Sequence, residues 1–322
     1  MLFRSILAVI TSIDREHLDC YGSLEELRHA YAEFANKVPF YGAAIVCLDD
    51  ENVRLIVPQL RRRIVSYGME PGVGSASPST LAQGGERQPN RSPQADLIAE
   101  SVECGHFQSR FHLRYHGEDL GGFELRVPGR HNVSNATAAA AVCLELKIEV
   151  ETIRAALAEF AGVERRFQVR GMVGGVTVVD DYGHHPTEIR ATLAAARDCG
   201  YARVLAVFQP HRYTRTALLL DEFGPSFDAA DAVFVLDIYP AGEPPIEGIS
   251  SETLVERMRA GARGTVEYQS RVEDVLQKLL GQVQPGDLVL TLGAGNVWQV
   301  GERFLELLRE RSTKVQAVSS RA

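Results

Sequence analysis

The second half of the chain alternates apolar runs with helix-forming segments, and this alternation constrains the fold more than any other feature. The apolar runs lie at residues 177–180, 203–208, 232–236 and 287–292. Helices are predicted after Pro186, after Thr214, at residues 251–260 and after Asn296. Strands that alternate with helices form a parallel sheet with helices on its faces, which predicts a Rossmann-like α/β domain.

Composition limits the classes of protein that the chain can represent. Its 322 residues are 45% hydrophobic and 24% charged, which is typical of a globular protein with room for two domains. The net charge of -8 gives no support for a nucleic-acid or membrane-surface partner. The five cysteines include no C-x-x-C pair, which favours reduced thiols in a cytoplasmic protein.

A polar cluster follows the first of these apolar runs, where residues 180–189 are D-D-Y-G-H-H-P-T-E-I. It places Asp181, Tyr182 and His184 at a strand-to-helix corner. Such corners at the carboxyl ends of parallel strands are where open α/β sheets bind ligands. A capped helix with a solvated turn is the structural alternative, but so many adjacent titratable and hydrogen-bonding groups favour a site.

The next apolar run is followed by F-Q-P-H-R-Y-T-R-T, residues 208–216. Arg212 and Arg215 lie three residues apart near a helix start, where they are suited to clamp a carboxylate or a phosphate. A solvated helix start is the alternative. We weigh it lower because this segment, like the first cluster, lies between the end of a predicted strand and the start of a predicted helix. Two such loops are expected to converge in a crevice at the sheet edge.

The first half is predicted to hold a strand at residues 5–11, buried on both faces and therefore preceded by further structure. The other predicted strands lie at 42–48 and 64–67, with a hairpin at 106–115 and 122–127. Helices are predicted at 24–37, from Glu51, at 136–146 and at 150–160. Residues 69–93, rich in Gly, Ser, Pro, Gln and Asn, are predicted to be a disordered surface insertion.

Two polar loops of the first half are candidate binding sites. The loop at residues 12–23 carries acids and His17, which suit a divalent cation, although the loop also suits a helix cap. The segment P-G-R-H-N-V-S-N holds His131, Asn132 and Asn135. Both asparagines fall on one helical face, and an amide matches the edge of an adenine. Asparagine is also a good helix cap, which is the structural alternative for one of them.

Together these motifs resemble the Mur ligase family. The resemblance rests on D-R-E-H-L-D-x-Y-G, G-R-H-N-V-S-N, E-R-R-F-Q, D-D-Y-G-H-H-P-T-E-I and F-Q-P-H-R-Y-T-R-T, and it covers nearly the whole chain outside the insertion. It implies an incomplete central ATP-binding domain at residues 1–162. A C-terminal amino-acid-binding ligase domain would follow at residues 163–322.

The resemblance also implies a reaction and roles for residues. ATP would phosphorylate the carboxylate of UDP-N-acetylmuramate, and the amine of L-alanine would displace the phosphate in the cytoplasmic stage of peptidoglycan synthesis. The implied roles group by ligand: His17 would help bind Mg²⁺; His131, Asn132 and Asn135 would surround the adenine; Arg166 and Asp181 would contact the nucleotide; Tyr182, His184, Arg212 and Arg215 would line the alanine and acyl-phosphate end.

Two features depart from the family's pattern. No G-x-x-x-x-G-K-[ST] loop occurs in the sequence, and the family's N-terminal domain for the UDP sugar is not recognised in it. We therefore expect the chain alone to be inactive. The missing part would lie in an adjacent reading frame, or it was lost when the reading frame was assigned. A non-catalytic remnant or binding module is the first alternative. A dinucleotide-dependent oxidoreductase is the second, because L-G-A-G-N at residues 292–296 contains a weak G-x-G signal.

Overall fold

The structure is a computed structural model that describes residues 5–16, 18–70 and 95–319, and these fall into two compact units. Unit 1 comprises Met1–Glu103, Ser109–Arg126 and Arg130–Phe160. Unit 2 comprises Cys104–Gln108, Val127–Gly129 and Ala161–Ala322. The domain boundary predicted at residue 162 lies close to the break after Phe160. Of the predicted insertion, all but Met69 and Glu70 lies outside the described residues.

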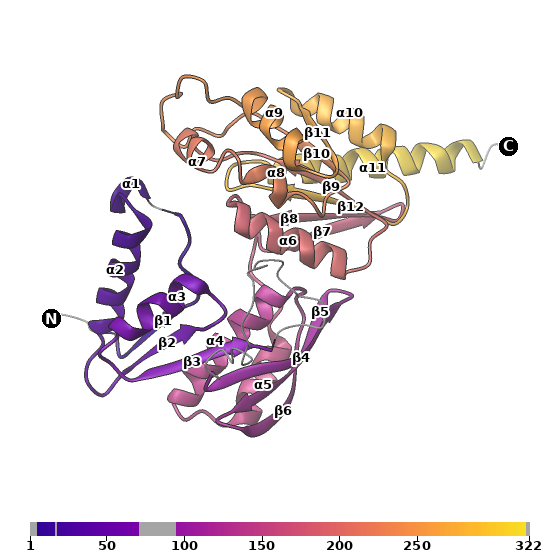
Figure 1. Cartoon of the computed structure of the whole chain (residues 1–322). Coiled ribbons are helices and arrows are strands. Elements are labelled where there is room, and N and C mark those ends of the chain that lie inside the picture. Colours follow the sequence, from indigo (N-terminus) through magenta and orange to yellow (C-terminus); the bar gives the residue numbers. More distant parts are fainter. Residues whose placement is uncertain (1–4, 17, 71–94, 320–322) are drawn as a thin grey trace, which may run out of the picture. The chain divides into compact units, whose positions relative to one another are not determined.

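Unit 1 contains a six-stranded sheet in the order β1-β2-β3-β4-β5-β6, with β1 to β4 parallel to one another (Figure 1). The strands are β1 Leu7–Ile10, β2 Ala43–Cys47, β3 Ile64–Met69, β4 Leu97–Gly105, β5 Gln108–Tyr115 and β6 Glu118–Leu125. The helices are α1 Leu18–Tyr21, α2 Leu24–Asn36, α3 Glu51–Ile56, the 3₁₀ helix η1 Val57–Gln59, α4 Arg130–Glu145 and α5 Val150–Glu159.

The predicted burial of residues 5–11 on both faces is wrong for the described part of the chain. Strand β1 is at one end of the strand order, and its burial alternates. Ala8 and Ile10 are buried, whereas Val9 is 37% exposed. Ile10 packs in a cluster with residues of β2, α2 and α3, so β1 contributes to the core through one face.

The predicted hairpin is present, but its turn is much shorter than expected. Strand β5 pairs antiparallel with β6 across His116 and Gly117. Both turn residues have positive φ, 47° and 86°, as a two-residue hairpin loop requires. The register shift between Leu113 and Arg114 marks a bulge in the pairing. Strand β6 begins at Glu118, four residues before the predicted start at Gly122.

Unit 2 contains a second six-stranded sheet in the order β11-β10-β9-β12-β8-β7 (Figure 1). The strands are β7 Gln168–Val173, β8 Val176–Asp181, β9 Arg203–Phe208, β10 Ala232–Val235, β11 Thr265–Tyr268 and β12 Asp287–Leu292. The helices are α6 Pro186–Asp198, α7 Tyr213–Leu218, α8 Phe223–Ser226, α9 Ser251–Gly261, α10 Val272–Gln282 and α11 Trp298–Ser319. All pairs of this sheet are parallel except β7 with β8.

Both faces of the unit 2 sheet are buried, as the continuous apolar runs predict. Alternate strand residues such as Val179 and Phe208 join Leu193 of α6 and Leu254 of α9 in one cluster. The opposite face, with Val178, packs against α10 and α11 in another. The predicted α/β class is therefore confirmed. None of the helices in the described ranges is long and apolar enough to cross a membrane.

Candidate active site

The candidate site of unit 2 forms where the strand order departs from the chain order. Strand β12 lies between β8 and β9, so the carboxyl ends of these three strands are neighbours. The amide of Gly293 donates to the carbonyl of Asp181 at 3.2 Å, and the amide of Gln209 donates to that of Leu292 at 2.9 Å. The loops after β8, β9 and β12 therefore begin side by side, which is the usual place for a ligand in an open α/β sheet.

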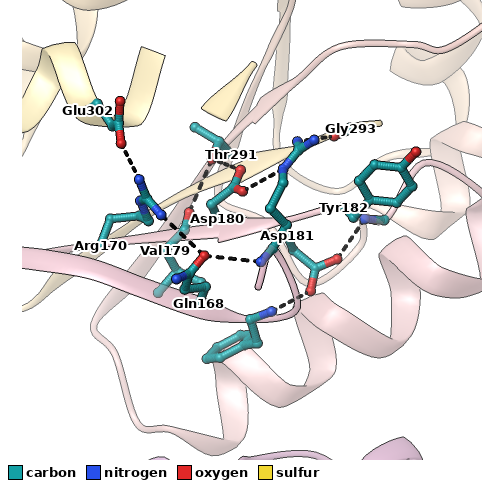
Figure 2. Close-up of polar contacts among 12 residues, drawn as sticks. Gln168, Arg170, Val179, Asp180, Asp181, Tyr182, Thr291, Gly293 and Glu302 are labelled. Carbon is teal, nitrogen blue, oxygen red and sulfur yellow. Dashed lines mark hydrogen bonds and ion pairs between the residues drawn. The ribbon is translucent and has the colours of Figure 1, made fainter. Parts of the chain in front are cut away.

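Asp180, at the end of β8, is a buried acid with structural partners (Figure 2). Its Oδ2 accepts from Arg165 Nε at 3.0 Å, and its Oδ1 accepts from the Thr291 hydroxyl at 2.7 Å. Arg165 also donates to the carbonyl of Gly293 at 2.7 Å. Arg165, near the start of the long C-terminal segment of unit 2, thus connects that segment with the ends of β8 and β12.

Asp181 is also buried, and it was predicted to contact a nucleotide. Its two oxygens accept from backbone amides, Oδ2 from Phe167 at 2.8 Å and Oδ1 from Gly183 at 2.7 Å (Figure 2). Burial raises the pKa of the Asp181 carboxyl, and the two amides oppose that rise. In this structure Asp181 therefore shapes the loops before and after it; contact with a nucleotide stays a prediction.

The Tyr182 ring lies next to two cationic groups. The guanidinium carbons of Arg165 and Arg166 lie 5.0 and 5.5 Å from its ring centroid. Arg166 also pairs with Glu188 at 3.2 Å, and 49% of its side chain is exposed. Of the two adjacent arginines, Arg166 is thus the one placed to meet a ligand from solvent.

His184 and His185 begin α6 in different ways. His185 is its N-cap, with Nδ1 accepting from the Thr187 amide, while Glu188 accepts from the backbone of both histidines in a capping box. Nδ1 of His184 lies 2.9 Å from the carbonyl oxygen of Tyr182, so this nitrogen donates. The capping alternative therefore accounts for His185, and it leaves His184 as the candidate functional histidine.

The loop after β9 brings a second histidine to the first. The ring centroid of His211 lies 5.5 Å from that of His184, and the His211 ring also stacks on Tyr239 with its centroid 5.6 Å away. Nδ1 of His211 lies 3.2 Å from Nη1 of Arg215, which can only donate, so Nδ1 accepts. Burial, together with His184 and Arg215, lowers the pKa of His211 to about 4.

His211 is therefore expected to stay neutral throughout the neutral pH range. Titration of its ring C–H resonances by NMR should show a midpoint near the pKa of about 4. The contribution of the neutral His211 ring to the free energy of unfolding should be complete above about pH 6.5, the pKa of an unperturbed histidine. It should be lost as the pH falls toward the pKa of His211 in the folded protein. Arg215→Ala should raise the midpoint, because a neighbouring positive charge is removed. A midpoint near that of the urea-unfolded chain would contradict this account.

Arg212 and Arg215 border the same group of rings. Arg212 is the N-cap of α7, and 45% of its side chain is exposed. Arg215, one helical turn later, is tied to His211 by its contacts with Nδ1 and with the backbone carbonyl. The structure thus brings Tyr182, His184, Arg212 and Arg215 to one end of one sheet. Sequence reasoning missed Tyr239, which comes from a loop without periodicity or motif.

The two glycines of L-G-A-G-N have a packing role here. Gly293 has φ +145°, and a Cβ there would lie 2.7 Å from the carbonyl oxygen of Gln209. A Cβ on Gly295 would lie 2.9 Å from the Tyr239 ring. Both contacts are closer than real Cβ atoms show. The weak dinucleotide signal is therefore explained by close packing at the site.

The candidate adenine residues of unit 1 lie at the start of α4. The helix begins at Arg130 rather than after residue 135, so His131, Asn132 and Asn135 are inside its first turns. His131 and Asn132 are half-buried, and Asn135 is exposed. His17 lies outside the described residues. Among the residues that the structure covers, no group of three or more His, Cys, Asp or Glu could hold a metal ion.

Comparison with known domain families accounts for both halves of the chain. Residues 2–143 match the Mur ligase middle domain, and residues 165–295 match the glutamate ligase domain of Mur ligases. The chain belongs to the Mur ligase family. Its family motifs therefore fall on two matched domains, and the expected assignment to this family is confirmed.

Two curated relatives of this Mur ligase chain share one name. It is 53% identical over 304 residues to the UDP-N-acetylmuramate--L-alanine ligase of Solibacter usitatus, covering 94% of this chain and 60% of the relative. The Koribacter versatilis protein of that name is 45% identical, with 97% and 63% covered. The chain thus spans about 60% of the length of the curated relatives it matches.

Solved structures show the same fold. The UDP-N-acetylmuramate-alanine ligase MurC of Thermotoga maritima superposes with a TM-score of 0.70 at 22% identity, covering 97% of this chain and 61% of that one. MurF of Acinetobacter baumannii gives 0.71 at 19% identity, with 95% and 60% covered. At these identities the likeness establishes the fold alone.

Proposed function

We propose that this chain forms the nucleotide- and amino-acid-binding part of an ATP-dependent ligase that joins L-alanine to UDP-N-acetylmuramate. The reaction would belong to the cytoplasmic stage of peptidoglycan synthesis. The proposal is supported by the shared name of relatives at 45 to 53% identity. It is also supported by the polar cluster at the carboxyl ends of β8 and β9.

The observation that carries the proposal is the grouping of two arginines with a neutral imidazole. Arg212 and Arg215 can bind a carboxylate or a transferring phosphoryl group, because their forked donors match such anions. His211 is uncharged near neutral pH and adds no positive charge against an incoming ammonium group. Tyr182 and His184 complete this end of the site, where the amine of alanine would meet the activated carboxylate.

Candidate nucleotide-binding residues are proposed in each unit separately. His131, Asn132 and Asn135 would bind the adenine, since Asn132 and Asn135 are one helical turn apart and still partly accessible. Arg166, whose side chain is 49% exposed, and Asp181 would contact the nucleotide. His17 would help hold Mg²⁺. ATP would supply the phosphoryl group that activates the carboxylate, and Mg²⁺ would offset charge on its oxygens.

This function can be tested by supplying the residues of the Solibacter usitatus relative that precede its matched segment. They should be added as a separate polypeptide and, in a second protein, joined to this chain. With ATP, Mg²⁺ and UDP-N-acetylmuramate, we expect L-alanine-dependent phosphate release from the joined chain and little from this chain alone, which has no G-x-x-x-x-G-K-[ST] loop. Release from the separate pair as well would support a separately encoded partner.

The alternatives predict different results in the phosphate-release assay or in a separate binding assay. A non-catalytic remnant or binding module would release no alanine-dependent phosphate even when joined. An oxidoreductase would instead show saturable fluorescence transfer on titration with NADH. Omitting L-alanine provides the control for ATP hydrolysis that is not coupled to amide synthesis.

A further inference from the structure

Helix α7, which begins after Arg212, starts in an unusual way. Its N-cap position favours Ser, Thr, Asp or Asn, whose side chains accept from the first helical amides. Arg212 cannot accept a hydrogen bond, and no side-chain cap comes from it. Its φ of +71° is a conformation that non-glycine residues rarely adopt. Six residues also form too short a helix to persist without tertiary contacts.

The loop between β10 and α9 supplies the missing contacts. The backbone of His211 bridges in parallel to that of Tyr239. The amide of Arg212 donates to the Tyr239 carbonyl at 2.8 Å, and the Tyr239 amide donates to the Pro210 carbonyl at 2.8 Å. These bonds fix the backbone immediately before α7, including the residue with positive φ.

The same loop then turns sharply and presents an acid to the helix start. The amide of Glu243 donates to the Pro240 carbonyl at 2.9 Å, across Ala241 and Gly242, which have φ of 49° and 86°. Oε2 of Glu243 accepts from the Thr214 amide at 3.0 Å, and Oε1 accepts from the Thr214 hydroxyl at 2.7 Å. Glu243 thus makes the hydrogen bond that an N-cap side chain would make.

Glu243 also lies beside the Arg212 side chain. Its Oε1 is 3.7 Å from Nη1 of Arg212, and 19% of the Glu243 side chain is exposed. Burial alone would raise the pKa of Glu243, but the Thr214 donors and the Arg212 charge lower it, so the group is ionised near neutral pH. A charged carboxylate therefore holds both the helix start and the arginine.

We propose that Glu243 is a positioning residue that caps α7 from a distant loop and thereby orients Arg212 toward an anionic substrate. The capping role follows from the contacts of Glu243 itself, and the orienting role rests on the proposed function. Because the cap is supplied by another loop, the N-cap position is available to an arginine. The cap by Glu243 would also position Arg215, which lies one turn further along α7.

The capping role can be tested on this chain by amide hydrogen exchange. Glu243→Ala should speed exchange at Thr214 by about fivefold, the size expected for the loss of a helix cap. Glu243→Gln keeps an acceptor oxygen and should give a smaller change. Glu247→Ala removes an exposed acid of the same loop and should leave Thr214 unchanged. Unchanged exchange in Glu243→Ala would overturn the proposal.

The orienting role can be tested in the joined chain described above. Glu243→Ala should raise KM for L-alanine about tenfold, with KM for ATP unchanged, since an interaction near one substrate is lost. In Glu243→Gln, the KM for L-alanine should stay close to that of the unmodified joined chain. A variant that merely destabilised the fold would lower kcat through the active fraction and leave both KM values in place, and this result would overturn the orienting role.

The two measurements separate this inference from the proposed function. If the unmodified joined chain releases no alanine-dependent phosphate, the function fails and so does the orienting role. Exchange at Thr214 would still decide whether Glu243 caps α7. If the joined chain is active and KM for L-alanine is unchanged in Glu243→Ala, the orienting role alone fails.

Discussion

Replacing Arg212 by alanine is expected to lower kcat/KM for L-alanine by about 100-fold in the joined chain, the usual size of effect when a donor to developing negative charge is lost. Arg212 lies at the carboxyl end of β9, and 45% of its side chain is exposed. Its charge is therefore available to a ligand and adds little to stability. Initial rates at several alanine concentrations measure this effect, and urea unfolding should be almost unchanged.

Two matched variants sharpen this test. Arg257 is another exposed arginine of unit 2, paired with Asp221 at 3.7 Å on the surface, and Arg257→Ala should keep normal activity. Arg212→Lys preserves the charge but loses the fork of donors, so its activity should fall between the two. Full activity in Arg212→Ala would remove this residue from the proposed site.

Arg165→Met is expected to destabilise unit 2 by about 3 kcal/mol, as happens when a buried acid loses its charged partner. Asp180 is 1% exposed and would keep only the Thr291 hydroxyl as a side-chain donor among its described contacts. The carbonyl of Gly293 would lose the guanidinium as well. Urea unfolding can be followed by the fluorescence of Trp298, the single tryptophan of the chain, which lies in unit 2.

The neighbouring residue provides the control. Arg166 forms an ion pair with Glu188, but 49% of its side chain is exposed, so Arg166→Met should cost less than about 1 kcal/mol. The order should reverse in the activity assay if Arg166 binds a phosphate. Equal losses of stability in both variants would show that the contact between Arg165 and Asp180 does not contribute the expected free energy of unfolding.

The central strands of unit 2 were predictable because burial on both faces leaves a continuous apolar run. The predicted bounds of β9 and β12 are those observed, and β8 differs by one residue at each end. The strands at the sheet edges were missed. Strand β7 is half-exposed and carries Gly171 beside a bulge, and β11 has four residues. Partial burial gives such strands no distinctive pattern.

At the site, too, features set by neighbouring residues were predictable, whereas features set by tertiary contacts were not. The motif D-D-Y-G-H-H-P predicted a strand-to-helix corner, and the structure has one, with Tyr182 and His184 on it. The role of Glu243 could not be foreseen, because it meets Thr214 from 29 residues further along the chain. Sequence also could not separate a buried Asp181 from an exposed one, since the backbone amides of Phe167 and Gly183 that donate to its carboxylate are found only in the structure.

The central place of β12 has a consequence for synthesis of the protein on the ribosome. Residues 287–292 pair with both β8 and β9, which are made about 80 to 110 residues earlier. Until β12 has emerged from the exit tunnel, these two strands lack a shared neighbour and expose open edges that favour misassembly. A nascent chain stalled before residue 287 should therefore remain sensitive to protease, and resistance should appear only once that last strand is available.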